Sequence, residues 1–344
     1  MIPIKYEKTM NKYIFTAVLI NIIQVINVTA QQKSGNPQDN LPANISRITQ
    51  FGERADFSHD GKKILFVGKT YGDVFEVELS TGKISLITGH FYHGGFTRAL
   101  YLANDDVLLS GCTSFDAANP HVNRQIKAEL WVLDKSYTKP PVRLGTKCSE
   151  GPAVSRKNMK IAWTVAHNQY SDSLRAGQYL FYMADIVYDN GIPKLSNKKV
   201  ILDNLKTEFK DMEVQNFVPP LENTMTFSAY GYQGTEVMLL NLETGAITNM
   251  SNADKQYDET EGVFPDGKYT CVESDKETGA VDIYKLPLDG SGKLKRLTFF
   301  SDYKGYKSSN PVISDDGKYM AFQMARSADF AGIGYGIFLM KLEK

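Results

Sequence analysis

The sequence predicts an all-β fold: a six-bladed β-propeller of four-stranded antiparallel blades, closed by a strand near the N-terminus. A short unit recurs along the chain, and it alternates tight turns with apolar, β-prone runs. The last unit also lacks one strand, which an N-terminal segment can supply. A four-stranded unit of roughly 40 to 50 residues cannot bury both of its faces alone, so copies stack around an axis.

The clearest copy of the repeat begins at residues 55–63 (ADFSHDGKK) and continues through apolar runs at 64–67 and 74–77. Its Asp-Gly pair supplies the positive φ that a tight hairpin needs. The second strand is apolar throughout, as expected for a strand covered on both faces. The opening pattern recurs at 262–269 and 311–319, with weaker copies at 152–158 and 217–223.

Counting the positions where the first strand of a unit begins gives six units. The sixth unit stops after its third strand, at residues 338–342. Residues 45–49 (ISRIT) closely resemble 294–298 (LKRLT), the outer strand of the fifth unit. We therefore expect the N-terminal segment to complete the sixth blade and close the ring. The units begin near Arg54, Phe96, Gly151, Gln215, Gly262 and Ser309.

The repeat resembles that of the TolB family of propellers, in which a small residue or proline precedes Ser-Pro-Asp-Gly-Lys and an apolar strand. The resemblance covers residues 45–344, with His59 and Asp315 standing in the proline position. The resemblance implies the fold. It does not imply one function, because such repeats occur in translocation proteins, peptidases and carbohydrate-active lyases alike. More distantly, the chain resembles oligogalacturonate-lyase-like propellers, which implies metal-assisted β-elimination of uronates, although their histidine-rich motif has no residue-by-residue match here.

The N-terminus resembles an export signal. Lysines precede an apolar run over residues 13–28, and Thr29 and Ala30 follow it. This pattern predicts a signal peptide over 1–30 and a periplasmic or secreted protein. Polar residues inside the run disfavour a stable membrane span. Residues 31–43 are polar and predict a flexible leader, followed by the propeller over 44–344.

Composition narrows the partners. The formal charge is zero, from 39 basic and 39 acidic residues, and no dense basic block occurs, so nucleic acid is not an expected partner. We expect a monomer without a membrane span in the mature chain. Cys112, Cys148 and Cys271 are too few and too scattered for a disulfide scaffold or a zinc site. A single Cys112–Cys148 disulfide and three free thiols remain open alternatives.

One face of a propeller carries the loops between the second and third strands and between successive blades, around the mouth of the channel. Three of the loops between the second and third strands are long, at 111–128, 166–178 and 325–336. Long loops of this kind often carry functional residues. Four of the five histidines fall on this face: His90, His93, His121 and His167. So do Arg98, Arg124, Arg175, Arg326, Glu150, Glu213, Gln215, Glu261, Tyr170, Tyr232 and Tyr257.

These residue types fit β-elimination from a uronic acid, by a lyase or dehydratase. Histidine is a general base near neutral pH, tyrosine returns a proton, and arginine neutralises the substrate carboxylate. The candidate bases are His93, His121 and His167. Tyr170 is the candidate acid, and Arg124 and Arg326 are the candidate carboxylate clamps. The expected substrate-binding residues are Arg98, Glu213, Gln215, Glu261 and Tyr232.

Other interpretations stay open. His93, His121, His167 and Glu213 would hold Mn²⁺ or Zn²⁺ only if the fold gathers them, because no metal-binding spacing occurs in the sequence. Each loop histidine is also compatible with a purely structural role. No Gly-x-Ser-x-Gly motif occurs, which disfavours a peptidase. The alternative function is a non-catalytic TolB-like propeller that binds a protein or peptide of the cell envelope.

Overall fold

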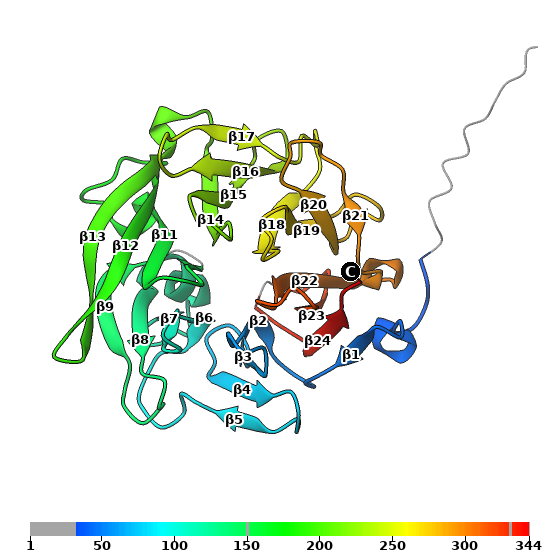
Figure 1. The fold of residues 1–344 in the computed structure, drawn as a ribbon, viewed down its shortest axis with the longest axis horizontal. Coiled ribbons are helices and arrows are strands. Elements are labelled where there is room, and N and C mark those ends of the chain that lie inside the picture. Colours follow the sequence, from blue (N-terminus) through cyan, green and yellow to red (C-terminus); the bar gives the residue numbers. More distant parts are fainter. Residues whose placement is uncertain (1–31, 149–150, 330–331, 344) are drawn as a thin grey trace, which may run out of the picture. The chain divides into compact units, whose positions relative to one another are not determined.

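Six antiparallel sheets of four strands each surround a central axis in the computed structural model (Figure 1). The structure describes residues 32–148, 151–329 and 332–343. The predicted signal peptide lies outside the described residues. The sheets are here called blades one to six in chain order, starting from the sheet that begins at Glu53. The first strand of each sheet lies nearest the axis and the fourth lies at the rim, as Figure 1 shows for blades four, five and one. The predicted six-bladed propeller is therefore confirmed.

Blades one to three follow one another along the chain, each in simple antiparallel order. Blade one contains β2 (Glu53–Phe57), β3 (Lys63–Val67), β4 (Val74–Glu78) and β5 (Ile84–Leu86). Blade two contains β6 (Phe96–Tyr101), β7 (Val107–Gly111), β8 (Glu129–Leu133) and β9 (Val142–Lys147). Blade three contains β10 (Ala153–Val154), β11 (Lys160–Ala166), β12 (Tyr179–Asp189) and β13 (Ile192–Asp203).

Blades four and five repeat this order, and blade six combines the two ends of the described chain. Blade four contains β14 (Asp211–Phe217), β15 (Thr224–Tyr230), β16 (Thr235–Asn241) and β17 (Ile247–Asn249). Blade five contains β18 (Asp258–Val263), β19 (Tyr269–Ser274), β20 (Asp282–Pro287) and β21 (Lys295–Arg296). Blade six contains β22 (Tyr306–Ile313), β23 (Tyr319–Arg326), β24 (Ile337–Lys341) and β1 (Ile45–Arg47).

The turns that define the repeat have the predicted conformation. Gly61, Gly267 and Gly317 follow an aspartate between the first two strands, and their φ angles are +66°, +68° and +69°. At Gly267 a Cβ atom would lie 1.8 Å from the carbonyl oxygen of Pro219, so no side chain fits there. The Asp-Gly signature thus marks a hairpin in each blade, and at Gly267 it also marks a close contact between neighbouring blades.

Strand β1 closes the ring, as predicted. It pairs antiparallel with β24, with Ser46 opposite Leu339. The pairing extends past the strand, because the Ile48 amide donates to the carbonyl of Ile337 at 2.8 Å and the Ile337 amide donates to the Thr49 hydroxyl at 2.9 Å. The first and last described segments are therefore held together by backbone hydrogen bonds.

The apolar core lies between the blades. Six clusters of buried side chains each combine residues from two neighbouring sheets. Phe181 of blade three and Phe227 of blade four meet in one of them, and their ring centroids are 5.4 Å apart. Phe57 of blade one and Ile337 of blade six belong to another. Each sheet thus depends on both neighbours for burial of its faces.

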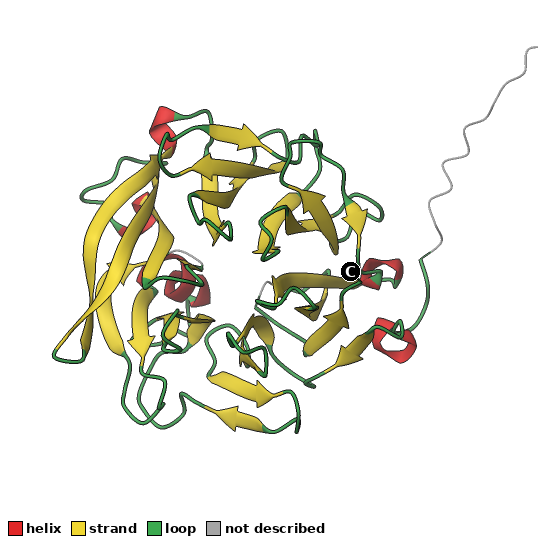
Figure 2. Ribbon diagram, viewed as in Figure 1, coloured by secondary structure: helices red, strands yellow, loops and turns green. Residues whose placement is uncertain are grey.

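Short helices connect the strands and stand out in red in Figure 2. They are η1 (Pro37–Asn40), α1 (Pro120–Val122), the π-helical η2 (Asn123–Lys127), η3 (His167–Gln169), η4 (Asn204–Lys206) and η5 (Phe300–Asp302). Within the described part of the chain, no helix has the length and apolar character of a membrane span.

The described part of the predicted leader lies against blade six. The Lys33 amide donates to the carbonyl of Asp302 at 2.6 Å, and the Lys33 ammonium lies 5.4 Å from the centroid of the Tyr303 ring. Residues 37–40 form η1, in which Pro37 is buried. These contacts give residues 33–40 a defined place, while the flexibility predicted for 31–43 stays a prediction.

All three cysteines are free and buried. The Cys112 thiol donates to the carbonyl of Gly94 at 3.3 Å, whereas Cys148 packs in the core between blades two and three. Cys271 lies in β19, inside the core between blades five and six. Of the two alternatives, three free thiols are confirmed and the Cys112–Cys148 disulfide is wrong.

Replacing Ile45 by alanine tests the closing strand. Ile45 is 7% exposed and packs into the core of blade six, so we expect the free energy of unfolding to fall by about 2 to 4 kcal/mol. Ile84 is the matched control, since it also lies in an outer strand but is 39% exposed, and Ile84→Ala should cost under about 1 kcal/mol. Denaturant unfolding measures both, and equal losses would contradict a special role for β1.

Candidate functional site

The inner strands bring many charged side chains to the axis. They line a cavity of about 240 Å³, here called the channel pocket. Its cations come from blades six, one and two, whereas its carboxylates come from blades four and five. Its ionisable residues are Arg54, Arg98, Arg124, Lys307, Glu213, Glu259, Glu261, Glu273, Tyr230 and Tyr257. The pocket therefore has a cationic side and an acidic side that face each other.

One ion pair spans the channel. The guanidinium of Arg98 in blade two lies 3.8 Å from the carboxylate of Glu261 in blade five, and their side chains are 11% and 7% exposed. The Asn310 side-chain amide of blade six donates to the same carboxylate at 3.0 Å. Arg98 and Glu261 also line a second cavity, so this pair stands between two cavities of the channel. A buried pair of this kind fixes the positions of opposite blades.

A chain of ionisable groups runs along the acidic side. The Tyr230 hydroxyl contacts Glu259 and also lies 3.1 Å from the carboxylate of Glu213. Tyr257 donates to the second oxygen of Glu259. One hydroxyl proton cannot serve two carboxylates at once, so the arrangement is most favourable when Glu213 carries a proton and donates it to Tyr230. The chain Glu213–Tyr230–Glu259–Tyr257 can thus hold and pass a proton.

Burial changes the ionisation of these carboxyl groups. Burial, together with repulsion from Glu259, raises the pKa of Glu213 and of Glu273 to about 7. Burial also raises the pKa of Glu261 well above its usual value, despite the opposing effect of Arg98. Near neutral pH a substantial part of this carboxyl cluster is therefore protonated.

The arginines keep their charge over the same range. Burial, with repulsion from Arg54, lowers the pKa of Arg124 to about 10, which still leaves it protonated at neutral pH. The arginines therefore stay cationic beside a carboxyl cluster of which part is neutral. The channel pocket therefore favours a ligand that carries a negative charge.

Four of the predicted site residues meet in the channel pocket: Arg98, Arg124, Glu213 and Glu261. Gln215 lines the second cavity together with Arg98 and Glu261. His121 lies in a neighbouring apolar pocket that Arg124 also lines. The predicted substrate-binding set is thus mostly gathered near the axis, although its role in binding stays a prediction.

The other two candidate bases have local contacts. His93 Nε2 lies 3.0 Å from the carboxylate of Asp73, and its Nδ1 accepts from the Gly95 amide at 3.0 Å. His167 Nδ1 lies 2.8 Å from the carbonyl oxygen of Leu174 in its own loop. Neither residue lines the channel pocket among the described residues. Both histidines therefore have the contacts of residues that fix loop conformation.

The remaining three candidates also have partners away from the channel pocket. Tyr170 accepts from the Lys147 amide at 2.8 Å, and Tyr232 donates to Glu208 at 2.9 Å. The Arg326 guanidinium lies over the ring of Tyr335, 5.4 Å from its centroid, and over the ring of Tyr306. Loop position alone did not reveal these packing partners.

The donor set does not fit the metal site considered from the sequence. Among residues 32–148, 151–329 and 332–343, no group of three or more histidine, cysteine, aspartate or glutamate side chains is arranged to hold a metal ion. His93 and His167 are engaged in the contacts described above. The combination of His93, His121, His167 and Glu213 therefore does not form a binding site for Mn²⁺ or Zn²⁺.

Sequence reasoning missed several residues of the channel pocket. They are Arg54, Glu259, Glu273, Lys307 and Tyr230. All except Tyr230 and Glu273 lie in the first strand of a blade, the strand nearest the axis. A charged residue in that otherwise enclosed strand was a usable signal, since such positions have only the channel to face.

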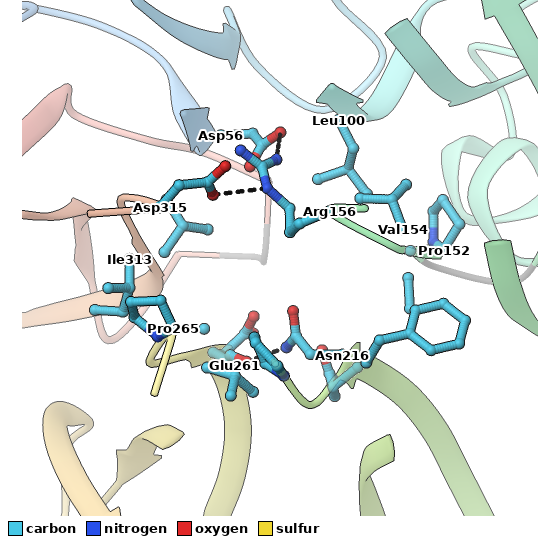
Figure 3. A pocket seen from close by; sticks show the side chains of 18 of the residues that line it. Asp56, Leu100, Pro152, Val154, Arg156, Asn216, Glu261, Pro265, Ile313 and Asp315 are labelled. Carbon is cyan, nitrogen blue, oxygen red and sulfur yellow. Dashed lines mark hydrogen bonds and ion pairs between the residues drawn. The ribbon is translucent and has the colours of Figure 1, made fainter. Parts of the chain in front are cut away.

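At the second cavity, charged side chains meet across the channel, and Figure 3 shows Asp56, Arg156 and Asp315 among them. Arg156 of blade three donates through Nε to Asp315 of blade six at 2.9 Å. Its guanidinium also lies 3.4 Å from the carboxylate of Asp56 in blade one. His59 Nδ1 lies 2.8 Å from Asp315. These four residues, here called the clasp, connect blade three to the junction where the ring closes.

The clasp explains the departures from the repeat. His59 and Asp315 precede Asp-Gly turns at the position where blade five has Pro265. Arg156 occupies the same position in blade three, since Ser155 hydrogen-bonds to Lys160 as the equivalent serine does in blade one. The three polar side chains that replace a proline therefore contact one another in space.

Comparison with known proteins supports the fold. No family model and no curated protein match the chain. An oligogalacturonate lyase in complex with manganese is similar in structure, with 12% identity, 85% of this chain and 78% of that chain covered, and a TM-score of 0.51. An oligogalacturonate lyase from Vibrio parahaemolyticus is also similar, with 12% identity, 87% of this chain and 94% of that chain covered, and a TM-score of 0.50. TolB from Acinetobacter baumannii has 15% identity, with 84% of this chain and 79% of that chain covered, and a TM-score of 0.45.

These likenesses concern the fold alone, because the identities are low. The chain is a six-bladed β-propeller similar to oligogalacturonate lyase, and TolB is among its structural neighbours. The predicted resemblance to oligogalacturonate-lyase-like propellers is thereby confirmed at the level of fold, and the six four-stranded sheets confirm the propeller that the TolB-type repeat implied.

Replacing Arg156 by methionine tests the clasp. The change leaves two carboxylates near each other without their cation, so we expect the free energy of unfolding to fall by about 2 kcal/mol at neutral pH. The side chains of Arg156 and Asp56 are 22% and 11% exposed. In the control Arg143→Met, a pair whose arginine is 53% exposed, the loss should stay below about 1 kcal/mol. A clasp variant as stable as the control would contradict this role.

Replacing Glu273 by glutamine tests the buried acid cluster. The raised pKa of Glu273 means that the folded state holds its proton more tightly than the unfolded chain, so its contribution to stability falls as pH rises from about 4.5 to about 7. Glutamine keeps an acceptor for the Asn310 amide and removes this loss. At pH 8 we expect the variant to gain about 1 kcal/mol or more over the native protein. Thermal unfolding across this pH range, with exposed Glu243→Gln as control, measures the effect, and parallel curves would refute it.

Proposed function

We propose that this protein is an exported carbohydrate-active enzyme that binds a uronic-acid-containing oligosaccharide at the channel pocket and acts on it by β-elimination. One observation carries the proposal: a carboxyl group with a pKa of about 7, linked to a tyrosine chain, shares its pocket with several arginines. These groups supply a base, an acid and a carboxylate clamp in one cavity.

Glu213 is the proposed general base. A base works best when its pKa lies near the working pH, and Glu213 meets this condition. It is half-buried, which leaves it open to a ligand in the pocket. Arg98 and Arg124 both act electrostatically on Glu213, so a substrate carboxylate paired with either would hold the acidic C–H bond close to the base.

The proposed step balances without a co-reactant. The proton on C5 of the uronate moves to the Glu213 carboxylate, and the electron pair of the C–H bond forms the C4–C5 double bond. The bond from C4 to its oxygen substituent breaks with the electron pair on oxygen. That oxygen takes a proton from Tyr230, and the Glu213 carboxyl group, which now carries the C5 proton, restores it. For a lyase the leaving group is the adjoining sugar, released with a free anomeric hydroxyl, and for a dehydratase it is water.

This assignment moves the base from the predicted histidines to a glutamate. His93 and His167 do not line the channel pocket, so the contacts give no support to their predicted role. Arg124 keeps its predicted role as clamp, and Arg98 shares it. The step uses no metal, because the donor groups of the described residues do not fit one. The choice of uronates also agrees with the activity named for two structural neighbours.

Incubation with pectin-, alginate-, ulvan- and glucuronan-type oligosaccharides tests the proposal through the ultraviolet absorbance of the conjugated product. We expect Glu213→Gln to lower the rate at least about 100-fold, because it removes the base. The rate of the native protein should rise with pH through about 7, as Glu213 becomes deprotonated. Glu243→Gln, an exposed change in the same blade, should leave the rate unchanged.

Absence of product on every substrate would contradict the enzymatic proposal. A specific partner recovered from cell-envelope extract under the same conditions would then favour the alternative, a non-catalytic propeller that binds an envelope protein or peptide. A native rate that Glu213→Gln leaves unchanged would retain elimination chemistry but refute Glu213 as its base.

A further inference from the structure

An apolar pocket adjoins the channel pocket. It has a volume of about 540 Å³ and is lined by Lys69, Thr70, Tyr71, Phe115, Pro120, His121, Arg124, Gly332 and Ile333. Arg124, Gly332 and Ile333 line both pockets. The two pockets therefore adjoin, and Arg124, the proposed carboxylate clamp of the first one, also lines the second.

Loops of three blades build this apolar pocket. Tyr71 comes from the loop between β3 and β4, Phe115 from the loop between β7 and β8, and Ile333 from the loop between β23 and β24. The ring centroids of Tyr71 and Phe115 are 5.3 Å apart at an interplanar angle of 45°. Phe115 and Ile333 are 48% and 45% exposed. The result is an apolar surface, open to a ligand, beside a charged pocket.

The backbone holds Tyr71 in a fixed place. Its amide donates to the carbonyl of Phe96 in blade two at 2.9 Å, and the neighbouring Thr70 amide donates to the carbonyl of Gly332 in blade six at 3.0 Å. A Cβ atom on Gly95 would lie 2.1 Å from the carbonyl oxygen of Tyr71, so only glycine allows this approach. Because both neighbouring blades support this loop, Tyr71 is preorganised for binding.

We propose that the apolar pocket binds the next sugar ring of the same acidic oligosaccharide, so that the enzyme prefers substrates of two or more units. The inference rests on the proposed function. A pyranose ring has an apolar C–H face that packs on aromatic side chains, while its hydroxyl and carboxylate groups need polar partners at the edge. Lys69, His121 and Arg124 supply such partners around the Tyr71–Phe115 pair.

The lining residues shared with the channel pocket favour this occupant. A chain whose first uronate pairs with Arg124 extends from the shared boundary at Gly332 and Ile333 directly into the apolar pocket. The cations at this end, Arg124 and Lys69, also match a ligand that carries one carboxylate per ring. An extended peptide is the competing occupant, and the experiment below distinguishes the two.

The test compares Phe115→Ala with Tyr92→Ala on two substrates. Tyr92 is an 87% exposed aromatic residue that lines neither pocket, so it controls for loss of surface area. On a uronate tetrasaccharide we expect Phe115→Ala to lower kcat/KM about 10-fold, mainly through KM. On a single uronate with a small alkoxy group at C4 it should change kcat/KM less than about 2-fold, and Phe115→Trp should restore the tetrasaccharide rate.

A second measurement separates failure of the subsite from failure of the proposed function. Calorimetry of Glu213→Gln with the tetrasaccharide reports binding without turnover. If the native protein turns over both substrates and Phe115→Ala behaves like Tyr92→Ala, the subsite is refuted while the proposed function stands. If neither turnover nor binding occurs with any uronate, both are refuted. Binding of an uncharged peptide that requires Phe115, without binding of the tetrasaccharide, would assign the pocket to the competing occupant.

Discussion

The pairing of β1 with β24 is the contact on which the rest of the molecule depends. Each blade buries its faces only against its two neighbours, as the six inter-blade clusters show. An open arc of blades would leave one apolar face exposed at each end. The backbone hydrogen bonds of Ile48 and Ile337 hold the two ends together. Closure of the ring thereby gives every sheet two covered faces.

A closed ring also sets the chemistry of the axis. Six inner strands converge there, and their axis-facing side chains can contact only one another, a ligand or water. Arg98 and Glu261 from opposite blades meet in this space, as do Arg156 and Asp315. The same crowding raises the pKa of Glu213 to about 7. One geometric constraint therefore yields both a structural clasp at one cavity and a proton-holding chain at the other.

The candidate site was partly predictable. Arg98, Arg124, Glu213 and Glu261 were identified because the blade count placed them at the channel mouth, and they line the channel pocket. Counting loops could not separate them from His93, Tyr170 or Arg326, since contacts with Asp73, Lys147 and Tyr335 depend on side-chain packing. Glu259 in β18 and Glu273 in β19 were missed because position relative to the loops does not indicate which side chains of a strand face the channel. The raised pKa values arise only when such strands meet.

The sequence by itself determined the repeat, the number of blades, the turn glycines and the source of the closing strand, because these features depend on local periodicity and on pairing between similar segments. The free state of Cys112 and Cys148 and the gathering of His59, Arg156 and Asp315 were decided only by the tertiary structure. So was the position of the Tyr71–Phe115 surface beside the channel pocket. These contacts join residues far apart in the chain, and the angle and depth at which each blade faces the axis fix them, which no local pattern encodes.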